Sequence, residues 1–170
     1  MTMSQTLQSA FNDQIQLEFS SAYTYLGMTA WCESRDLAGF ARWMRAQASE
    51  ETEHAMKFLD FVLGRDGTIT LQPIEAPSGG FSSVLDVLEQ ALGHEQRVTA
   101  AIGRLYAQAS EEGDYSSLPL LQWFMGEQVE EEATVRQIVA ELRMVGDDTS
   151  ALLLLDRDMG ARRGPSSDPA

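Results

Sequence analysis

The sequence has few of the residues that would indicate secretion or membrane insertion. Its one cysteine, Cys32, cannot form a disulfide within the chain, so a reducing compartment, the cytoplasm, is expected. The first residues, MTMSQTLQSAFNDQ, lack the basic and apolar regions of a signal peptide. No apolar run approaches the roughly 20 residues that span a bilayer, so no membrane contact is expected.

Basic residues are also scarce. Only 12 Lys and Arg stand against 26 Asp and Glu, which gives a formal net charge of −14. Sequence-independent nucleic-acid binding needs cations that neutralise phosphates, so this charge argues against a nucleic-acid partner. Cations are the natural partners of such a chain, although acidic surfaces are also common among soluble proteins.

Proline is rare, with five in 170 residues, so long helices are permitted over most of the chain. The length fits one domain, which we assign to residues 1–160. The last ten residues, ARRGPSSDPA, are predicted to form a disordered tail at 161–170.

Apolar residues recur at helical spacing in four long segments. The first runs from Gln5 to Glu33, and the second has an apolar stripe from Phe40 to Arg65. A third begins after an N-cap at Ser82 or Ser83 and ends near Glu112, and the fourth runs from about Ser117 to Val145. A short fifth helix is predicted from Asp147 to Met159. These segments predict an all-α protein.

The segment between the second and third helices, Asp66–Ser82, gathers Gly and Pro and is predicted to be a loop. A helix of 28 residues is ~42 Å long, and an extended linker of this length reaches ~56 Å, enough to run the length of a bundle. Returning to the same end would need far fewer residues. We therefore predict the single long crossover of ferritin-like four-helix bundles, with a disordered insertion in an up-down bundle as the alternative.

Polar residues interrupt the apolar stripes of all four helices. They are Glu18 in the first helix, Glu51 and His54 in the second, Glu95 in the third, and Gln128 and Glu131 in the fourth. A buried carboxylate costs several kcal/mol unless it is paired or binds a metal, and no Lys or Arg occurs near these acids in the stripes. Two divalent cations would balance the four carboxylates, which predicts a dinuclear metal site.

The spacing of these residues repeats. Glu18 and Glu51 are 33 residues apart, as are Glu95 and Gln128, and in each half a further ligand follows three residues later. The two halves superpose at an offset of 77 residues, as two related hairpins facing each other would require. Residues at i and i+3 share a helix face, so each hairpin supplies one lone acid and one two-ligand group.

At these residues the sequence resembles the non-haem bacterial ferritins, from Gln5 to about Met159. The resemblance is carried by the strings QLEFSSAYTYL, SEETEHAMKFLD, GHEQRVTAAI and LQWFMGEQVEEE. It implies that the first iron is held by Glu18, Glu51 and His54, and that Glu51 bridges to a second iron held by Glu95 and Glu131. It further implies that Gln128 flanks or ligates the second iron, and that Tyr25 lies beside the site as a hydrogen-bond donor or redox partner.

The resemblance also implies a third iron site, formed by Glu50, Glu127 and Glu130 together with Glu131. The alternative for the first three is a solvated helix face. Haem is not expected, because Gln128–Glu131 departs from the second E-x-x-H of bacterioferritins. Thr52 also stands where their haem-ligating Met would be.

The function that the resemblance implies is iron storage with ferroxidase activity. Fe²⁺ would be oxidised by O₂ or peroxide at the di-iron site, and Fe³⁺ would be stored as mineral inside a 24-subunit shell. Two alternatives stay open: an uncaged di-iron oxidase acting on another substrate, and a storage or structural subunit whose site does not turn over.

Overall fold

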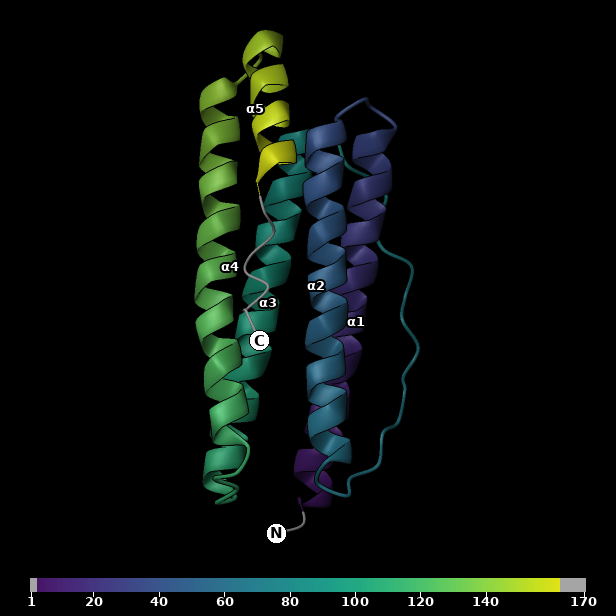
Figure 1. Ribbon diagram of the computed structural model, residues 1–170, viewed down its shortest axis with the longest axis vertical. Coiled ribbons are helices and arrows are strands. Elements are labelled where there is room, and N and C mark those ends of the chain that lie inside the picture. The colour runs from purple at the N-terminus through teal and green to yellow at the C-terminus, as the bar shows by residue number, and fades with distance from the viewer. Residues whose placement is uncertain (1–2, 163–170) are drawn as a thin grey trace.

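The computed structural model describes residues 3–162 and contains, within that range, five α-helices and no strand. The helices are α1 (Gln5–Glu33), α2 (Ala38–Leu63), α3 (Val84–Glu111), α4 (Leu118–Val145) and α5 (Thr149–Ala161) (Figure 1). The predicted all-α class is therefore confirmed. No helix in the described part of the chain combines the length and the hydropathy that a membrane span requires.

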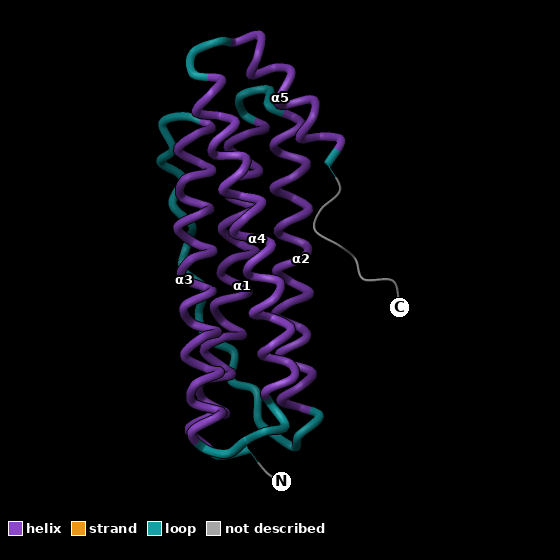
Figure 2. The backbone as a smooth tube through the Cα atoms, turned by 90° about the vertical axis from the view of Figure 1, so that its left-hand side faces the viewer, coloured by secondary structure: helices purple, strands orange, loops and turns teal. Residues whose placement is uncertain are grey.

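Two helical hairpins make the bundle. α1 packs closely on α2, and α3 packs closely on α4, while α5 covers one end and rests mainly on α2. Seen from the side, the four long helices stand almost parallel, with loops at both ends (Figure 2). The hairpins therefore face each other across a shared interior.

The connection from α2 to α3, residues 64–83, runs along the outside of α1 from one end of the bundle to the other (Figure 1). Hydrogen bonds tie its first part to α1. The Asn12 side-chain nitrogen donates to the Thr68 carbonyl at 3.0 Å, and the Thr70 backbone N–H donates to the Asn12 side-chain oxygen at 2.7 Å. The predicted long crossover is confirmed, and the up-down alternative is wrong.

Side-chain caps explain where several helices begin. The hydroxyl groups of Ser4 and Ser83 accept from backbone N–H groups in the first turns of α1 and α3, and Asp148 does so for α5. α2 has no such cap on its own N-cap residue, Leu37. Instead, the Asp156 carboxylate of α5 accepts from the Phe40 backbone N–H at 2.9 Å, so α5 satisfies the start of α2.

The predicted stripe of the second helix is wrong at its last member. α2 ends at Leu63, and Arg65 lies in the turn that follows. Its guanidinium group donates to Asp114 at 2.8 Å and to Ser117 at 3.0 Å. A charged group at the helix end therefore links the two hairpins rather than packing in the core.

The predicted fifth helix exists, shifted by two residues, because Asp148 caps it and Ala161 ends it. Of the predicted tail, residues 163–170 lie outside the described part of the chain.

The core consists of two apolar clusters. One surrounds Tyr25, Trp43 and Leu88 near α5, and the other surrounds Phe11, Phe58 and Phe124 at the opposite end. On every long helix the two clusters are separated by about two to three turns. The polar residues that interrupt the apolar stripes lie in that gap.

Candidate metal centre

All four long helices contribute polar side chains to the layer between the apolar clusters. Each side chain is almost completely withdrawn from solvent, with at most 4% of its residue surface exposed. The residues are Glu18 from α1, Glu51 and His54 from α2, Glu95 from α3, and Gln128 and Glu131 from α4. The structure therefore brings the six sequence-predicted ligands into one buried layer.

Their ligand atoms converge in overlapping groups. In each group, one ligand atom per residue lies within 4.8 Å of the others. One group joins Glu18, Glu51 and His54, and a second joins Glu51, Glu95 and Glu131. Because Glu51 belongs to both, two groups of residues that could hold a metal ion share one carboxylate.

The carboxylates of this layer lack positive partners. Within residues 3–162, no Lys or Arg forms an ion pair with any of the four glutamates. Both oxygens of Glu51, both of Glu131 and one of Glu18 are buried without a hydrogen-bond partner. Buried polar atoms are almost always satisfied in native proteins, so five such oxygens in one place fit a metal-binding site.

Burial raises the pKa of each of these acids above its ordinary value. The pKa of Glu18 rises to about 7, chiefly because burial penalises its charge. Burial and then the neighbouring Glu95 raise the pKa values of Glu51 and Glu131 well above 4.5. Without cations, this layer therefore holds protons at neutral pH, and cation binding must displace them.

His54 lies against two of the acids and two aromatic rings. Its Nδ1 is 3.6 Å from Glu51 and 3.9 Å from Glu131. The rings of Trp123 and Phe124 meet the imidazole edge-on at 5.8 and 5.3 Å. Burial, followed by the charge of Lys57, lowers the pKa of His54 to about 4. The imidazole is therefore neutral near pH 7, the form that binds metals.

Two hydrogen bonds orient individual acids. The Gln14 amide donates to one oxygen of Glu18 at 2.7 Å, and the Tyr25 hydroxyl donates to Glu95 at 2.5 Å. Burial and then Glu95 raise the pKa of Tyr25 above 10, so its hydroxyl keeps its proton. Tyr25 thus lies beside the centre as a hydrogen-bond donor.

Only some of the residues predicted for a third iron site lie close together. Glu50 is half-buried, and burial followed by the charge of Glu127 raises its pKa to about 8. Glu50 forms a ligand group with His54 and Glu131. In the described chain, Glu127 and Glu130 belong to no such group, and Glu130 is exposed.

His94, next to Glu95 in the sequence, faces a different direction. Its Nε2 lies 2.6 Å from the Ser21 hydroxyl, and its Nδ1 lies 3.1 Å from the Arg97 guanidinium group. Both ring nitrogens therefore have partners outside the metal layer.

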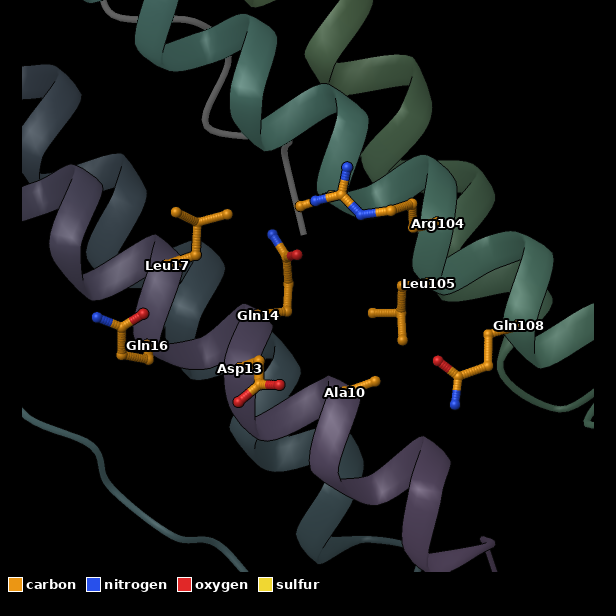
Figure 3. Close-up of a pocket in the computed structure, with 9 residues that line it drawn as sticks. Ala10, Asp13, Gln14, Gln16, Leu17, Arg104, Leu105 and Gln108 are labelled. Atoms are coloured by element: carbon orange, nitrogen blue, oxygen red, sulfur yellow. The ribbon is translucent and has the colours of Figure 1, made fainter.

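A pocket of about 400 Å³ opens between α1 and α3 beside this layer. Figure 3 shows the Gln14 side chain pointing into it from α1, while the Arg104 side chain reaches over it from α3. The same Gln14 amide donates to Glu18, so Gln14 contacts both the pocket and the layer.

Some residues around the centre were not predicted from the sequence. Gln14 contacts Glu18, and Thr99 contacts both Gln128 and Glu132. Gln14 precedes Glu18 by four residues, one helical turn, and this spacing is a signal that could have identified it. The contacts of Thr99 depend on how α3 packs against α4, so they have no comparable sequence signal.

The set of donor groups is typical of a transition-metal site rich in oxygen. Four carboxylates and one imidazole surround the layer, and Gln128 adds an amide that carries no charge. Carboxylate oxygens and imidazole together suit divalent iron and related ions. Four negative charges match two divalent cations, so the residues present fit a dinuclear site.

Known proteins resemble this chain along nearly its whole length. A family model described as "Ferritin-like domain" matches residues 8–145. The "Bacterial non-heme ferritin" of Staphylococcus aureus is 35% identical over 160 residues, 94% of this chain and 96% of that protein. The "Probable bacterial non-heme ferritin-like protein" of Haemophilus influenzae is 35% identical over 158 residues, 93% and 96% of the two chains.

Solved structures agree with these matches. An open pore ferritin from the hyperthermophilic archaeon Archaeoglobus fulgidus superposes with a TM-score of 0.94 at 42% identity. The match covers 95% of this chain and all of that one. With its crossover bundle and its layer of carboxylates between two apolar clusters, the chain belongs to the ferritin family.

Proposed function

We propose that this chain is an iron-storage ferritin subunit that oxidises Fe²⁺ at the buried carboxylate layer. The observation that carries the proposal is the set of buried, unpartnered oxygens on Glu18, Glu51 and Glu131. An apo-centre of this kind is costly, and cations that bind there remove the cost.

The two cation positions differ in their ligands. The first would be held by Glu18, Glu51 and His54, and the second by Glu51, Glu95 and Glu131. Gln128 lies beside the second position. The carboxylates are hard ligands that stabilise Fe³⁺ more than Fe²⁺, so this environment favours oxidation.

In the proposed reaction two Fe²⁺ ions each lose one electron. One O₂ accepts both electrons and two protons to give H₂O₂, or one H₂O₂ accepts them with two protons to give two water molecules. Protons are available locally, because the raised pKa values of Glu51 and Glu131 mean that cation binding releases protons from the layer. The paired site lets both electrons leave in one step.

The third site is part of the proposal. Glu50 adjoins the centre through His54 and Glu131. Glu127, whose charge raises the pKa of Glu50, and the exposed Glu130 lie three residues apart on α4. We propose that these acids receive Fe³⁺ as it leaves the centre for the mineral store.

We further propose that the subunits form a 24-subunit shell in the cytoplasm. Exposed apolar side chains on α1 and on the crossover support burial against other subunits: Tyr23, Leu26, Leu71 and Ile74 are 40–71% exposed in the single chain. The relative from A. fulgidus is titled an open pore ferritin, and we extend assembly to this chain by analogy. The buried free thiol of Cys32 is consistent with a reducing compartment.

Iron oxidation in air tests the catalytic part. Fe²⁺ is added to the cation-free protein, to Glu18→Ala and to Glu53→Ala, an exposed acid of α2 that serves as the control. We expect the initial rate to fall at least about 100-fold in Glu18→Ala and to stay unchanged in Glu53→Ala. Equal rates in all three proteins would eliminate the proposed site.

Sizing of the purified protein, followed by iron loading of the assembled particle, tests storage. A particle of about 450 kDa, from 24 × 18.8 kDa, that takes up hundreds of iron ions would support a storage shell. A dimer that oxidises iron but retains none would instead indicate an uncaged di-iron oxidase.

A further inference from the structure

The second cation position has a neutral amide beside it, Gln128, whose nitrogen is held by several contacts. The Gln128 side-chain nitrogen lies 3.3 Å from three oxygens: the Glu95 main-chain carbonyl, the Glu95 carboxylate and the Thr99 hydroxyl. An amide has a donor end and an acceptor end, and only its carbonyl oxygen can bind a cation. The orientation of this amide therefore decides whether Gln128 contributes a ligand.

Thr99 makes one orientation favourable. Its hydroxyl oxygen lies 2.6 Å from a Glu132 carboxylate oxygen and 3.0 Å from the Glu95 carbonyl oxygen. The single hydroxyl hydrogen is donated to one of these acceptors, and the shorter, charge-assisted bond to Glu132 is the stronger. Thr99 then faces Gln128 with a lone pair, which accepts an amide N–H and repels an amide oxygen.

Glu132 is itself held in place. Arg136, one turn further along α4, donates to its other carboxylate oxygen at 3.2 Å. The Glu132 side chain is only 17% exposed, whereas that of Arg136 is 60% exposed. A chain of contacts thus runs from the surface, through Glu132 and Thr99, to the buried amide.

The first hairpin has no counterpart of this chain. At the 77-residue offset that relates the halves, Thr99 corresponds to Ala22 (99 − 77 = 22) and Glu132 to Ala55 (132 − 77 = 55). Gln128 corresponds to Glu51 by the same subtraction. A carboxylate has two equivalent oxygens, so no partner is needed to decide which end faces a cation, whereas an amide needs one. The hydroxyl and its carboxylate partner therefore occur only in the half that contains an amide.

We propose that Thr99 and Glu132 are positioning residues that turn the Gln128 nitrogen toward α3, so that the Gln128 carbonyl oxygen is offered to the second cation. The inference rests on the proposed dinuclear centre. It assigns Gln128 a neutral oxygen ligand, which binds a cation without adding a fifth negative charge to the layer.

Cobalt binding tests the inference without redox turnover. Co²⁺ is titrated into the cation-free protein, and the visible absorption of bound Co²⁺ reports both affinity and ligand geometry. The second equivalent is identified as the one lost in Glu95→Ala. Thr99→Val removes the hydroxyl while keeping the side-chain shape, and Thr99→Ser keeps the hydroxyl. Thr29→Val is the control, because the buried Thr29 hydroxyl donates only to a carbonyl of its own helix, at 2.8 Å.

We expect Thr99→Val to weaken the second equivalent about 10-fold and to change its Co²⁺ spectrum, because loss of a group that orients a ligand typically costs 10–100-fold in affinity. The first equivalent should be unchanged. Thr99→Ser and Thr29→Val should both bind as the parent protein does. Glu132→Ala should weaken the second equivalent about 3-fold alone and have no further effect in the Thr99→Val background.

Parent-like affinity and spectrum in Thr99→Val would overturn the inference while leaving the dinuclear centre intact. Equal weakening in Thr99→Val and Thr99→Ser would overturn it as well, because the hydroxyl would then not be the acting group. Binding of fewer than two Co²⁺ per parent chain would overturn the proposed centre and this inference together.

Discussion

The two hairpins of the bundle contribute to the buried polar layer at corresponding positions but with different residues. Each places a lone acid on one helix and two polar groups three residues apart on the next. The first hairpin uses Glu51 and His54, and the second uses Gln128 and Glu131. His54 is neutral near pH 7 because its pKa is lowered to about 4, and Gln128 carries no charge. Each hairpin therefore contributes two negative charges, enough for one divalent cation.

The difference shows that charge balance is kept within each hairpin while the neutral ligand changes from imidazole to amide. The position of the neutral group also changes, from the second to the first member of the pair. As a result, Glu51 can be shared between the cation positions, while its counterpart Gln128 cannot bridge as a carboxylate does. The halves are related in sequence spacing but unequal in chemistry.

Removing single carboxylates should have the largest effect, because it changes the number of cations that each chain binds. We expect Glu18→Ala and Glu95→Ala each to bind one Co²⁺ or Zn²⁺ per chain, and Glu51→Ala to bind none tightly, because Glu51 belongs to both ligand groups. Calorimetric titration of the cation-free variants counts the ions. Two tight ions in Glu51→Ala would contradict the shared position.

The hairpins also differ in how α5 meets them. Gly39 of α2 lies so close to α5 that a Cβ atom there would be 1.6 Å from the Asp156 carbonyl oxygen. Gly39→Ala should therefore lower the free energy of unfolding by about 3 kcal/mol, because α5 must move. Gly103→Ala on α3 is the matched control, since its Cβ meets nothing within 4 Å. It should raise stability by about 0.5–1 kcal/mol. Urea unfolding measures both, and equal effects would show that α5 is not closely packed on α2.

The pH dependence of the cation-free protein tests the raised pKa values. A raised carboxyl pKa means that the folded state holds a proton that the unfolded state has lost, so stability falls as pH rises toward the folded value. Glu18 acts in this way up to about pH 7, and Glu50 up to about pH 8. Up to about pH 6.5 the two histidines oppose them, because pKa values lowered to about 4 make stability rise with pH.

The informative window is therefore pH 6.5 to 8, where the histidines no longer contribute. We expect the melting temperature of the cation-free protein to fall by roughly 5 °C across it. Saturating Zn²⁺ should reduce the fall, because the carboxylates that bind it, Glu18 among them, are then ionised and only the contribution of Glu50 is left. A melting temperature that stays level or rises without metal would contradict the raised pKa values of Glu18 and Glu50.

Giving the second hairpin a carboxylate at position 128, the counterpart of Glu51, should have the smallest effect. Gln128→Glu adds a fifth buried carboxylate, so the cation-free protein at pH 8 should lose about 2 kcal/mol of stability. Gln122→Glu, at an exposed position of the same helix, should change stability by less than about 0.5 kcal/mol. Equal values for the two variants would show that Gln128 is not in a charge-sensitive environment.

Much of the fold followed from the sequence because helical periodicity is a local property. The first helix was predicted from Gln5 to Glu33, as observed, and its N-cap needs only Ser4. Arg65 was wrongly predicted to belong to the stripe of the second helix. It lies in the next turn, and its partner there, Asp114, is too distant in sequence to be predicted. Asp156 was not recognised as the cap of α2 for the same reason.

The six predicted ligands could be named because a polar residue in an apolar stripe is visible from spacing alone. Their partners could not be named. Whether Thr99 faces Glu132 depends on the packing of α3 against α4 and on side-chain rotamers, which periodicity does not determine. His94 illustrates the reverse case, since it adjoins a ligand in sequence yet bonds to Ser21 and Arg97.

The central claim is that the two unequal hairpins together hold two iron ions. Anomalous X-ray diffraction at the iron edge, on crystals soaked anaerobically in Fe²⁺, tests it most directly. The account predicts two iron peaks per chain in the buried layer, one beside Glu18, Glu51 and His54 and the other beside Glu51, Glu95 and Glu131. A single peak in that layer, or iron confined to the surface, would contradict it.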